Sequence, residues 1–317
     1  MSHKLLTVTL NPAIDINYPI PDFQIDKVQR TEESFKSAGG KGLNVARVGH
    51  LLGLDVCCTG IVGGHMGEWL KADLDHSNMA HQFISSPVET RLCIAINSDY
   101  SQTEILESGA THPTEISQQF LEHFAKLITD YDIITISGSL PKGFDPMYYV
   151  RLLEIAHESQ KKVCLDTSGE ALKNAILHSQ HCPPYLIKPN TEELAMLVND
   201  STSKDVSEIL TAPHLAHIPN ILLSQGDEGA TLRTNEACYQ YAIPKIEVVN
   251  PVGSGDSSVA GFCYGLAQTH SPKEAAKYAM AAGVCNALEH RTGYIDLTNY
   301  QHVLSQINYT KVAQQHD

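Results

Sequence analysis

Residues 133–136, Ile-Ile-Thr-Ile, begin a stretch in which short apolar segments recur between helical patterns. The next such segments are Val-Cys-Leu at 163–165, Tyr-Leu-Ile at 185–187 and Ile-Leu-Leu at 221–223. Short segments with no polar side are typical of strands that are buried on both faces of a sheet.

The intervening stretches have helical periodicity. We expect helices at 114–129, 147–159, 170–177, 192–198 and 204–211. Helices that alternate with buried strands indicate a parallel sheet covered on both faces. The fold class predicted is therefore α/β, with three α/β/α layers around a mostly parallel central sheet.

Toward the N-terminus, strands are expected at 5–10 and 56–62 and helices at 43–52 and 66–74. Two segments, 16–37 and 88–107, do not fit this alternation. The first contains Pro19 and Pro21 and alternates loosely, as exposed or edge strands do. We therefore predict one domain over 1–317, with a small separate β-sheet lid inserted at about 16–37 and 88–107.

Polar and glycine-rich motifs follow the predicted strands directly, at 137–141, 166–169, 188–193 and 224–229. Any one of them could be a plain turn. Ligands of open α/β sheets bind at the carboxyl ends of strands, so four motifs at equivalent positions favour a binding site.

The clearest functional signal is 250–262, Asn-Pro-Val-Gly-Ser-Gly-Asp-Ser-Ser-Val-Ala-Gly-Phe. Gly253 and Gly255 allow backbone N–H groups to converge around Ser254, and the following helix contributes a positive dipole. This combination predicts an anion hole. Asp256 could simply cap the helix, but a carboxylate beside an anion hole is also suited to act as a general base. Neither a Walker A sequence nor a Rossmann fingerprint is present.

This motif and Gly-Gly-Lys-Gly-Leu-Asn at 39–44 resemble the two signatures of the ribokinase-like (pfkB) carbohydrate kinases. Blocks at 11–15, 90–91, 137–141, 166–169, 188–193 and 224–229 match in order, so the resemblance covers essentially the whole chain. It is greatest to the phosphohexose kinase branch. Residues 250–261 and 292–294 favour tagatose 6-phosphate as the acceptor, with fructose 1-phosphate as the alternative.

The resemblance implies a role for each matching residue. Asp256 would be the catalytic base, and Gly253, Ser254 and Gly255 would form the anion hole. Lys188, Asn190 and Glu193 would order ATP and Mg²⁺, with Glu193 acting on the metal through water. Other nucleotide contacts would come from Ser224, Gly226 and Gly229. Substrate contacts would come from Asp15, Lys27, Gly39, Gly40, Lys41, Asn44, Arg91 and Ser139, of which Lys27, Lys41 and Arg91 are the candidates for the sugar's existing phosphate.

Simpler interpretations remain for some of these residues. Lys27 and Lys41 could be solvated surface lysines, and Asp15 could close an Asx turn after the first strand. Glu193 could be an ordinary acid in the first turn of a helix. Arg91 lies within an apolar strand, where an unpaired guanidinium is costly.

The overall charge limits the possible partners. With 22 Lys and Arg against 36 Asp and Glu, the net charge is −14, which argues against a nucleic-acid partner. No apolar run is long enough to span a membrane. The eight cysteines have neither Cys-x-x-Cys nor zinc-ligand spacing, so we expect reduced thiols and a cytoplasmic location.

Two classes of function therefore remain. The first is an ATP-dependent kinase that makes a 1,6-bisphosphate from a ketohexose phosphate. The second is a non-catalytic sugar-phosphate or nucleotide sensor on the same fold. The kinase is favoured because a carboxylate at Asp256 would repel bound phosphates in a simple binder. The apolar residues of the lid also predict a homodimer in which two lids pack face to face.

Overall fold

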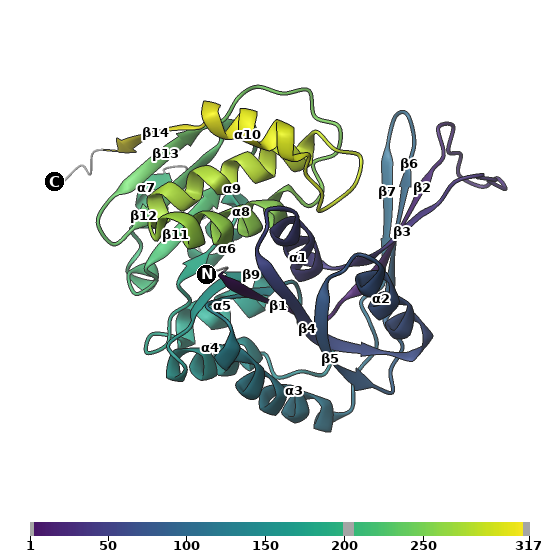
Figure 1. Cartoon of the computed structure of the whole chain (residues 1–317), viewed down its shortest axis with the longest axis horizontal. Helices are drawn as coiled ribbons and strands as arrows, with labels where there is room; N and C mark the ends of the chain where they lie inside the picture. Colours follow the sequence, from purple (N-terminus) through teal and green to yellow (C-terminus); the bar gives the residue numbers. More distant parts are fainter. Residues whose placement is uncertain (1–2, 199–205, 313–317) are drawn as a thin grey trace.

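A computed structural model, which describes residues 3–198 and 206–312, has a twisted central sheet between two layers of helices (Figure 1). The strands run in the order β14-β13-β12-β11-β10-β9-β8-β1-β4-β5. Their bounds are β1 Lys4–Thr9, β4 Asp55–Gly63, β5 Ala80–Ser86, β8 Ile133–Ser137, β9 Lys162–Asp166, β10 Leu186–Ile187, β11 Asn220–Ser224, β12 Ala230–Thr234, β13 Cys238–Ala242 and β14 Asn308–Val312. The strands from β5 to β11 in this order are parallel, and β12, β13 and β14 are antiparallel additions. The predicted fold class is confirmed.

The helices divide between the two faces of the sheet. One face is covered by α1 (Lys41–Leu51), α2 (Gly64–His76), α8 (Ser254–Thr269), α9 (Pro272–Ala287) and α10 (Leu297–Gln306). The other is covered by α3 (Thr114–Leu127), α4 (Tyr148–Glu158), α5 (Gly169–His178), α6 (Thr191–Val198) and α7 (Val206–Leu210). Short 3₁₀ turns lie at Ile128–Asp130, Pro213–Leu215 and Gly226–Glu228. Residues 204 and 205 of the helix expected at 204–211 lie outside the described residues.

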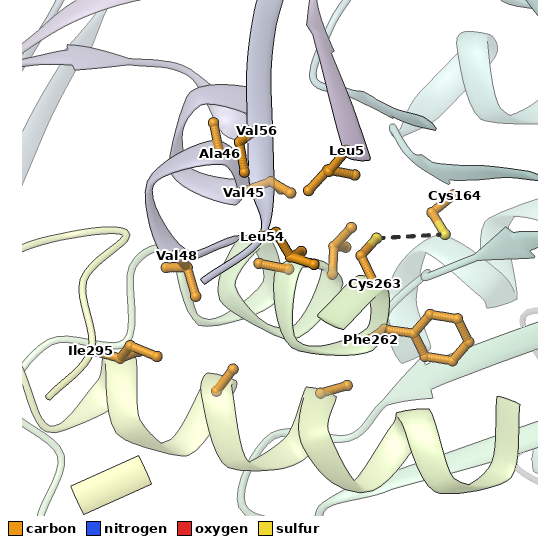
Figure 2. Close-up of a cluster of buried hydrophobic side chains, with 14 of the residues drawn as sticks. Leu5, Val45, Ala46, Val48, Leu54, Val56, Cys164, Phe262, Cys263 and Ile295 are labelled. Carbon is orange, nitrogen blue, oxygen red and sulfur yellow. Dashed lines mark hydrogen bonds between the residues drawn. The ribbon is translucent and has the colours of Figure 1, made fainter. Parts of the chain in front are cut away.

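The two layers explain why the central strands are mostly apolar, with buried exceptions such as Thr135 in β8. In β8, Ile133 packs into the core on the α8 side, whereas Ile134 and Ile136 pack on the α3 side. Successive side chains of a strand point to opposite faces, so a strand buried on both faces needs no polar residue. Figure 2 shows the α8 side, where Cys263 of α8 is turned toward Cys164 of β9 with 3.9 Å between the sulfurs.

A separate sheet has the order β3-β2-β6-β7 and projects from the main body (Figure 1). Its strands are β2 Ala13–Pro19, β3 Phe35–Gly39, β6 Arg91–Asn97 and β7 Gln102–Leu106. The strand register puts Asp15 opposite Cys93 on one face and Ile16, Ile94 and Ile105 in line on the other. The small sheet therefore has a polar face and an apolar face.

The sequence did not predict the outer strands of the central sheet, which are β5 at one edge and β12, β13 and β14 at the other. The residues of β5, Ala-His-Gln-Phe-Ile-Ser-Ser, are mostly polar and only partly buried, so they lack the apolar signature of the central strands. No helix among the described residues has the length and apolar character needed to span a membrane. The cytoplasmic location stays a prediction.

Candidate active site

A cavity of about 960 Å³ lies where the carboxyl ends of the central strands face the small sheet. Its lining includes Asp15 and Arg91 from the small sheet, Lys188 after β10, and Asp256 from α8. The site therefore lies at the strand ends, where ligands of open α/β sheets bind.

Helix α8 begins at one side of this cavity. Gly253 caps it in the left-handed region, with φ 81°. A Cβ at this position would lie 2.6 Å from Thr292 Cγ2, so both the backbone conformation and the close approach require glycine. The Ser254 N–H donates to the Pro251 carbonyl oxygen at 3.2 Å, whereas the N–H groups of Gly255 and Asp256 have no carbonyl partner earlier in the helix and are available to an anion.

Asp256, in the first turn of α8, is only 7% exposed. Its Oδ2 accepts a hydrogen bond of 2.9 Å from Asn44 Nδ2 on α1. Burial raises the pKa of Asp256 well above its ordinary value, and nearby Asp166 raises it further. Lys41, the Asn44 hydrogen bond and Lys188 act in the opposite direction. The result is a sequestered carboxylate with a high proton affinity.

Two lysines converge on Asp166, the last residue of β9. Asp166 Oδ1 lies 3.5 Å from Lys41 Nζ and 3.7 Å from Lys188 Nζ. Asp166 is the largest cause of the raised pKa of Lys41. A Cβ on Gly255 would lie 3.0 Å from Lys188 Nζ, which places that ammonium at the start of α8. Positive charge is therefore concentrated where the helix dipole also favours an anion.

Asp15 on β2 lies against the turn into α1. A Cβ on Gly39 would collide with the Asp15 carboxyl group, so glycine is required for this packing. Burial raises the pKa of Asp15 to about 6, opposed by the charges of Arg47 and Arg91 and by a backbone hydrogen bond from Gly40.

Arg91 lines the cavity, but its guanidinium already has protein partners. Its Nε and one terminal nitrogen donate to the carbonyl oxygen of Asn11 at 3.2 and 3.1 Å. The other terminal nitrogen donates to the carbonyl oxygen of Glu107 at 2.6 Å. These carbonyl partners offset the cost of placing a guanidinium in this strand.

Asn190 and Glu193 form a reciprocal cap at the start of α6. Asn190 Oδ1 accepts from the Glu193 N–H at 2.8 Å, and Glu193 Oε2 accepts from the Asn190 N–H at 3.0 Å. This is capping-box geometry. Both side chains also line the cavity, so the capping interaction and a role in binding are compatible.

The cavity brings together most of the residues that the sequence singled out: Asp15, Gly40, Lys41, Asn44, Arg91, Lys188, Asn190, Glu193, Ser224, Gly253, Gly255 and Asp256. Gly39 and Ser254 directly adjoin it in sequence. Lys27 is exposed in the loop between β2 and β3 and is not part of the lining.

The remaining three expected residues have local structural partners. Ser139 Oγ accepts from Asn11 Nδ2 at 3.2 Å. Gly226 and Gly229 bound a 3₁₀ turn and both have positive φ, and a Cβ on Gly229 would collide with the Tyr241 carbonyl oxygen. These glycines therefore satisfy the simpler interpretation as turn residues, and none of the three lines the cavity.

Sequence reasoning missed two polar residues that organise the site. Asn286 on α9 is fully buried and donates to the carbonyl oxygen of Val252 at 2.8 Å. Its Oδ1 accepts from Ser257 Oγ and from the Gly293 N–H, at 3.0 and 2.8 Å. Arg47 on α1 contacts Asn44. An asparagine in an alanine-rich helix was the available signal for Asn286, and the spacing of three residues from Asn44 was the signal for Arg47.

No group of three or more His, Cys, Asp or Glu side chains that could hold a metal lies within residues 3–198 and 206–312. A magnesium ion needs few protein ligands when it also binds substrate phosphates. Asp166 Oδ2 is buried without a hydrogen-bond partner. An unpartnered carboxylate oxygen beside Lys188 is chemically suited to Mg²⁺ or to a water bound to it.

Comparisons with known proteins agree on one family. Residues 9–299 match the model of the pfkB family of carbohydrate kinases. Two curated proteins named tagatose-6-phosphate kinase, from two strains of Staphylococcus epidermidis, are 40% identical over 311 residues, covering 97% of this chain and 100% of each relative.

Solved structures of similar proteins agree. One is phosphofructokinase-2 from Escherichia coli in complex with fructose-6-phosphate, with TM-score 0.83 and 25% identity over 96% of this chain and 98% of that chain. Another is a possible 1-phosphofructokinase from Thermotoga maritima, with TM-score 0.86 and 25% identity over 98% of this chain and 100% of that chain.

Proposed function

This chain belongs to the pfkB family of carbohydrate kinases, and on that premise we propose that it transfers the γ-phosphoryl group of ATP to a ketohexose phosphate. The acceptor we propose is tagatose 6-phosphate, which would become the 1,6-bisphosphate. The 40% identity to two proteins of that name supports this choice.

The observation that carries the proposal is Asp256, a carboxylate in the first turn of α8 that is 7% exposed. In the proposed reaction, an acceptor hydroxyl loses its proton to Asp256 as its oxygen forms a bond to the γ-phosphorus. The bond from phosphorus to the bridging oxygen breaks, and ADP leaves. The N–H groups at the start of α8 and the ammonium of Lys188 stabilise the charge on the phosphoryl oxygens.

Mg²⁺ bound with ATP would neutralise phosphate charge and orient the γ-phosphoryl group. Asp166, through its unpartnered Oδ2, and Glu193, through water, are the residues we propose to hold it. Lys41 and Lys188 contact the other oxygen of Asp166, Oδ1, so they hold its carboxylate in place.

The sugar would lie between the small sheet and α1. We propose that Asp15 and the 39–44 segment bind its hydroxyl groups, and that Arg91 and Lys41 bind its existing phosphate. Lys27 lies in the exposed loop of the small sheet. It could contact the sugar phosphate only if that loop took a different position, or if it reached the substrate of a neighbouring chain.

A coupled assay of ADP release tests the proposed function. Tagatose 6-phosphate, fructose 1-phosphate, fructose 6-phosphate and ribose would be compared at equal ATP. We expect the highest kcat/KM with tagatose 6-phosphate. The alternative acceptor is fructose 1-phosphate, which the likeness to the possible 1-phosphofructokinase from Thermotoga maritima favours. Preferred turnover of ribose would contradict the requirement for a phosphorylated acceptor.

A non-catalytic sensor is the alternative from a different class. Such a protein would bind phosphates more tightly without a carboxylate at position 256, because like charges repel. Sensor function would be indicated if none of the four sugars supports ADP release, and if Asp256→Asn tightens ATP binding.

We also propose that the small sheet acts as a lid and as the contact between two copies of the chain. Its polar face carries Asp15 toward the cavity. On its opposite face Ile105 is 54% exposed, and in the loop before β3 Val28 is 81% exposed. Apolar surface left uncovered in this way is typical of an interface.

Sedimentation equilibrium tests the proposed homodimer. The wild type should sediment at twice the mass of the 34.7 kDa chain at micromolar concentration. Ile105→Glu should shift it toward the monomer, whereas Leu177→Glu, at an exposed position on α5, should not. A monomeric wild type would contradict the proposal.

A further inference from the structure

Arg47 connects parts of the cavity that are far apart in the sequence. One of its terminal nitrogens donates to Asn44 Oδ1 at 3.1 Å and to the Thr292 carbonyl oxygen at 3.3 Å. The other donates to the Ala38 carbonyl oxygen at 2.5 Å. All three acceptors are neutral, and Arg47 forms no ion pair within 4 Å among the described residues.

The first of these contacts fixes the orientation of the Asn44 amide. A guanidinium can only donate hydrogen bonds, so the side of the amide that faces Arg47 must be the oxygen. The Asn44 NH₂ group then faces Asp256, to whose Oδ2 it donates at 2.9 Å. Arg47 therefore determines which atom of Asn44 meets the carboxylate, and Asn44 engages one oxygen of that carboxylate.

The contact of Arg47 with Ala38 holds the backbone just before Gly39 and Gly40, in the segment that we propose to bind the sugar. The Ala38 carbonyl accepts from Arg47, and the Ala38 N–H donates to Asp73 Oδ2 on α2 at 2.8 Å. The backbone of residue 38 is thus held from both sides, immediately before Gly39 and Gly40. A Cβ on Gly39 would collide with the carboxyl group of Asp15, so this segment and Asp15 are in close contact.

We propose that Arg47 is a positioning residue that aligns the acceptor sugar with the catalytic base, by orienting Asn44 toward Asp256 and by holding the 38–40 segment against Asp15. This inference rests on the proposed function, because it assigns Asp256 as base and Asp15 as a sugar ligand. A small misplacement of either group lowers the rate steeply, since reaction requires near-attack geometry.

A purely structural role is the competing explanation, and the chain offers a matched control for it. Arg233 on β12 is 8% exposed and donates to the carbonyl oxygens of Ile218 and Leu215, both at 2.6 Å. Like Arg47 it joins separate backbone segments, but it does not line the cavity. Loss of Arg233 should therefore report what an arginine of this kind contributes to folding alone.

The experiment compares Arg47→Gln, Arg47→Lys and Arg233→Gln with the wild type. Melting is followed by circular dichroism, and kcat and both KM values are measured well below each midpoint. Binding of tagatose 6-phosphate is measured by calorimetry, which needs no turnover. If the wild type turns over none of the sugars, the proposed function fails. The calorimetry then still shows whether Arg47 organises the sugar side.

For Arg47→Gln we expect kcat to fall at least about tenfold and the sugar KM to rise severalfold, with the ATP KM within about twofold of the wild type. Arg47→Lys should recover part of the loss, because an ammonium can still donate to Asn44 Oδ1. Arg233→Gln should lower the melting midpoint and leave both KM values unchanged. The proposal is overturned if Arg47→Gln only lowers the midpoint, or if Arg233→Gln weakens sugar binding equally.

Discussion

Asp256→Asn should abolish most turnover and at the same time stabilise the folded protein. Asparagine keeps the size of the side chain, and its Oδ1 can still accept the hydrogen bond from Asn44 Nδ2, but it cannot accept the hydroxyl proton. Loss of a general base costs on the order of 10² to 10⁴ in rate. The gain in stability follows because burial and Asp166 make the carboxylate costly to ionise.

The sign and size of the stability effect follow from the raised pKa of Asp256. In the unfolded chain the pKa of an aspartate is about 3.9, whereas folding raises the pKa of Asp256 well above this value. Stability is therefore lost as pH rises from the unfolded pKa to the folded one, and the deficit is constant above both. The folded pKa of about 7 lies about three pH units above the unfolded value, and each pH unit corresponds to about 1.4 kcal/mol. At pH 8 we therefore expect the variant to be more stable by about 3–5 kcal/mol.

Thermal melting from pH 4 to pH 8 measures this effect. A gain of that size raises the midpoint by roughly 4–8 °C at pH 8 for a chain of this size. The difference should shrink to a small fraction of that value near pH 4, where Asp256 is protonated in the folded protein and about half protonated in the unfolded chain. Asp227→Asn is the control, because it removes the same charge from an exposed 3₁₀ turn.

Two results would refute the reasoning. If Asp256→Asn melts below the wild type at pH 8, then Lys41 and Lys188 stabilise the carboxylate by more than burial and Asp166 destabilise it. If turnover stays within about threefold of the wild type, Asp256 is not the base.

Three further predictions concern other parts of the site. As the pH is lowered, kcat/KM should decline with a midpoint at about pH 6 or above, because the pKa of Asp15 is raised to about 6 and both Asp15 and Asp256 must be ionised. Full activity down to about pH 4.5 would contradict this. Arg91→Lys should raise the sugar KM by about tenfold and leave the ATP KM unchanged, because a point charge cannot serve both carbonyl groups and an anion; an unchanged sugar KM would exclude Arg91 from phosphate binding. Asn286→Ala should destabilise the protein by about 2–5 kcal/mol and lower kcat, because it leaves several buried groups unpaired. Melting and steady-state kinetics measure the two effects, and Asn299→Ala, at an exposed position on α10, should show neither.

The sequence was most informative where one physical constraint acts on several consecutive residues. A strand covered on both faces is mostly apolar on both sides, so 133–136 and 221–223 predicted the central sheet correctly. Prolines in 16–37 likewise predicted strands outside that sheet. The edge strand β5 escaped prediction because it is only partly buried and its sequence is therefore unconstrained.

Contacts within the site were harder to predict because they join residues that are distant in sequence. The spacing of Asn190 and Glu193 is compatible both with a capping box and with a ligand pair, and the structure has the capping box within the cavity lining. Arg47 could be placed near Asn44 from helical spacing alone. Its contact with Thr292, 245 residues away, depends on how α1 packs against the loop after α9.

The charge distribution also explains how so acidic a chain can hold phosphorylated ligands. The net charge is −14, yet the cavity lining includes Lys36, Lys41, Arg47, Arg91, Lys188 and Arg291. Lys41 and Lys188 lie 3.5 and 3.7 Å from the same Asp166 oxygen, so one carboxylate is shared between two ammonium groups. Arg47 and Arg91 donate to neutral oxygens. The lining also includes Asp15, Glu33, Glu104, Glu193 and Asp256, so six cations stand against five carboxylates and the cavity is far less acidic than the chain as a whole.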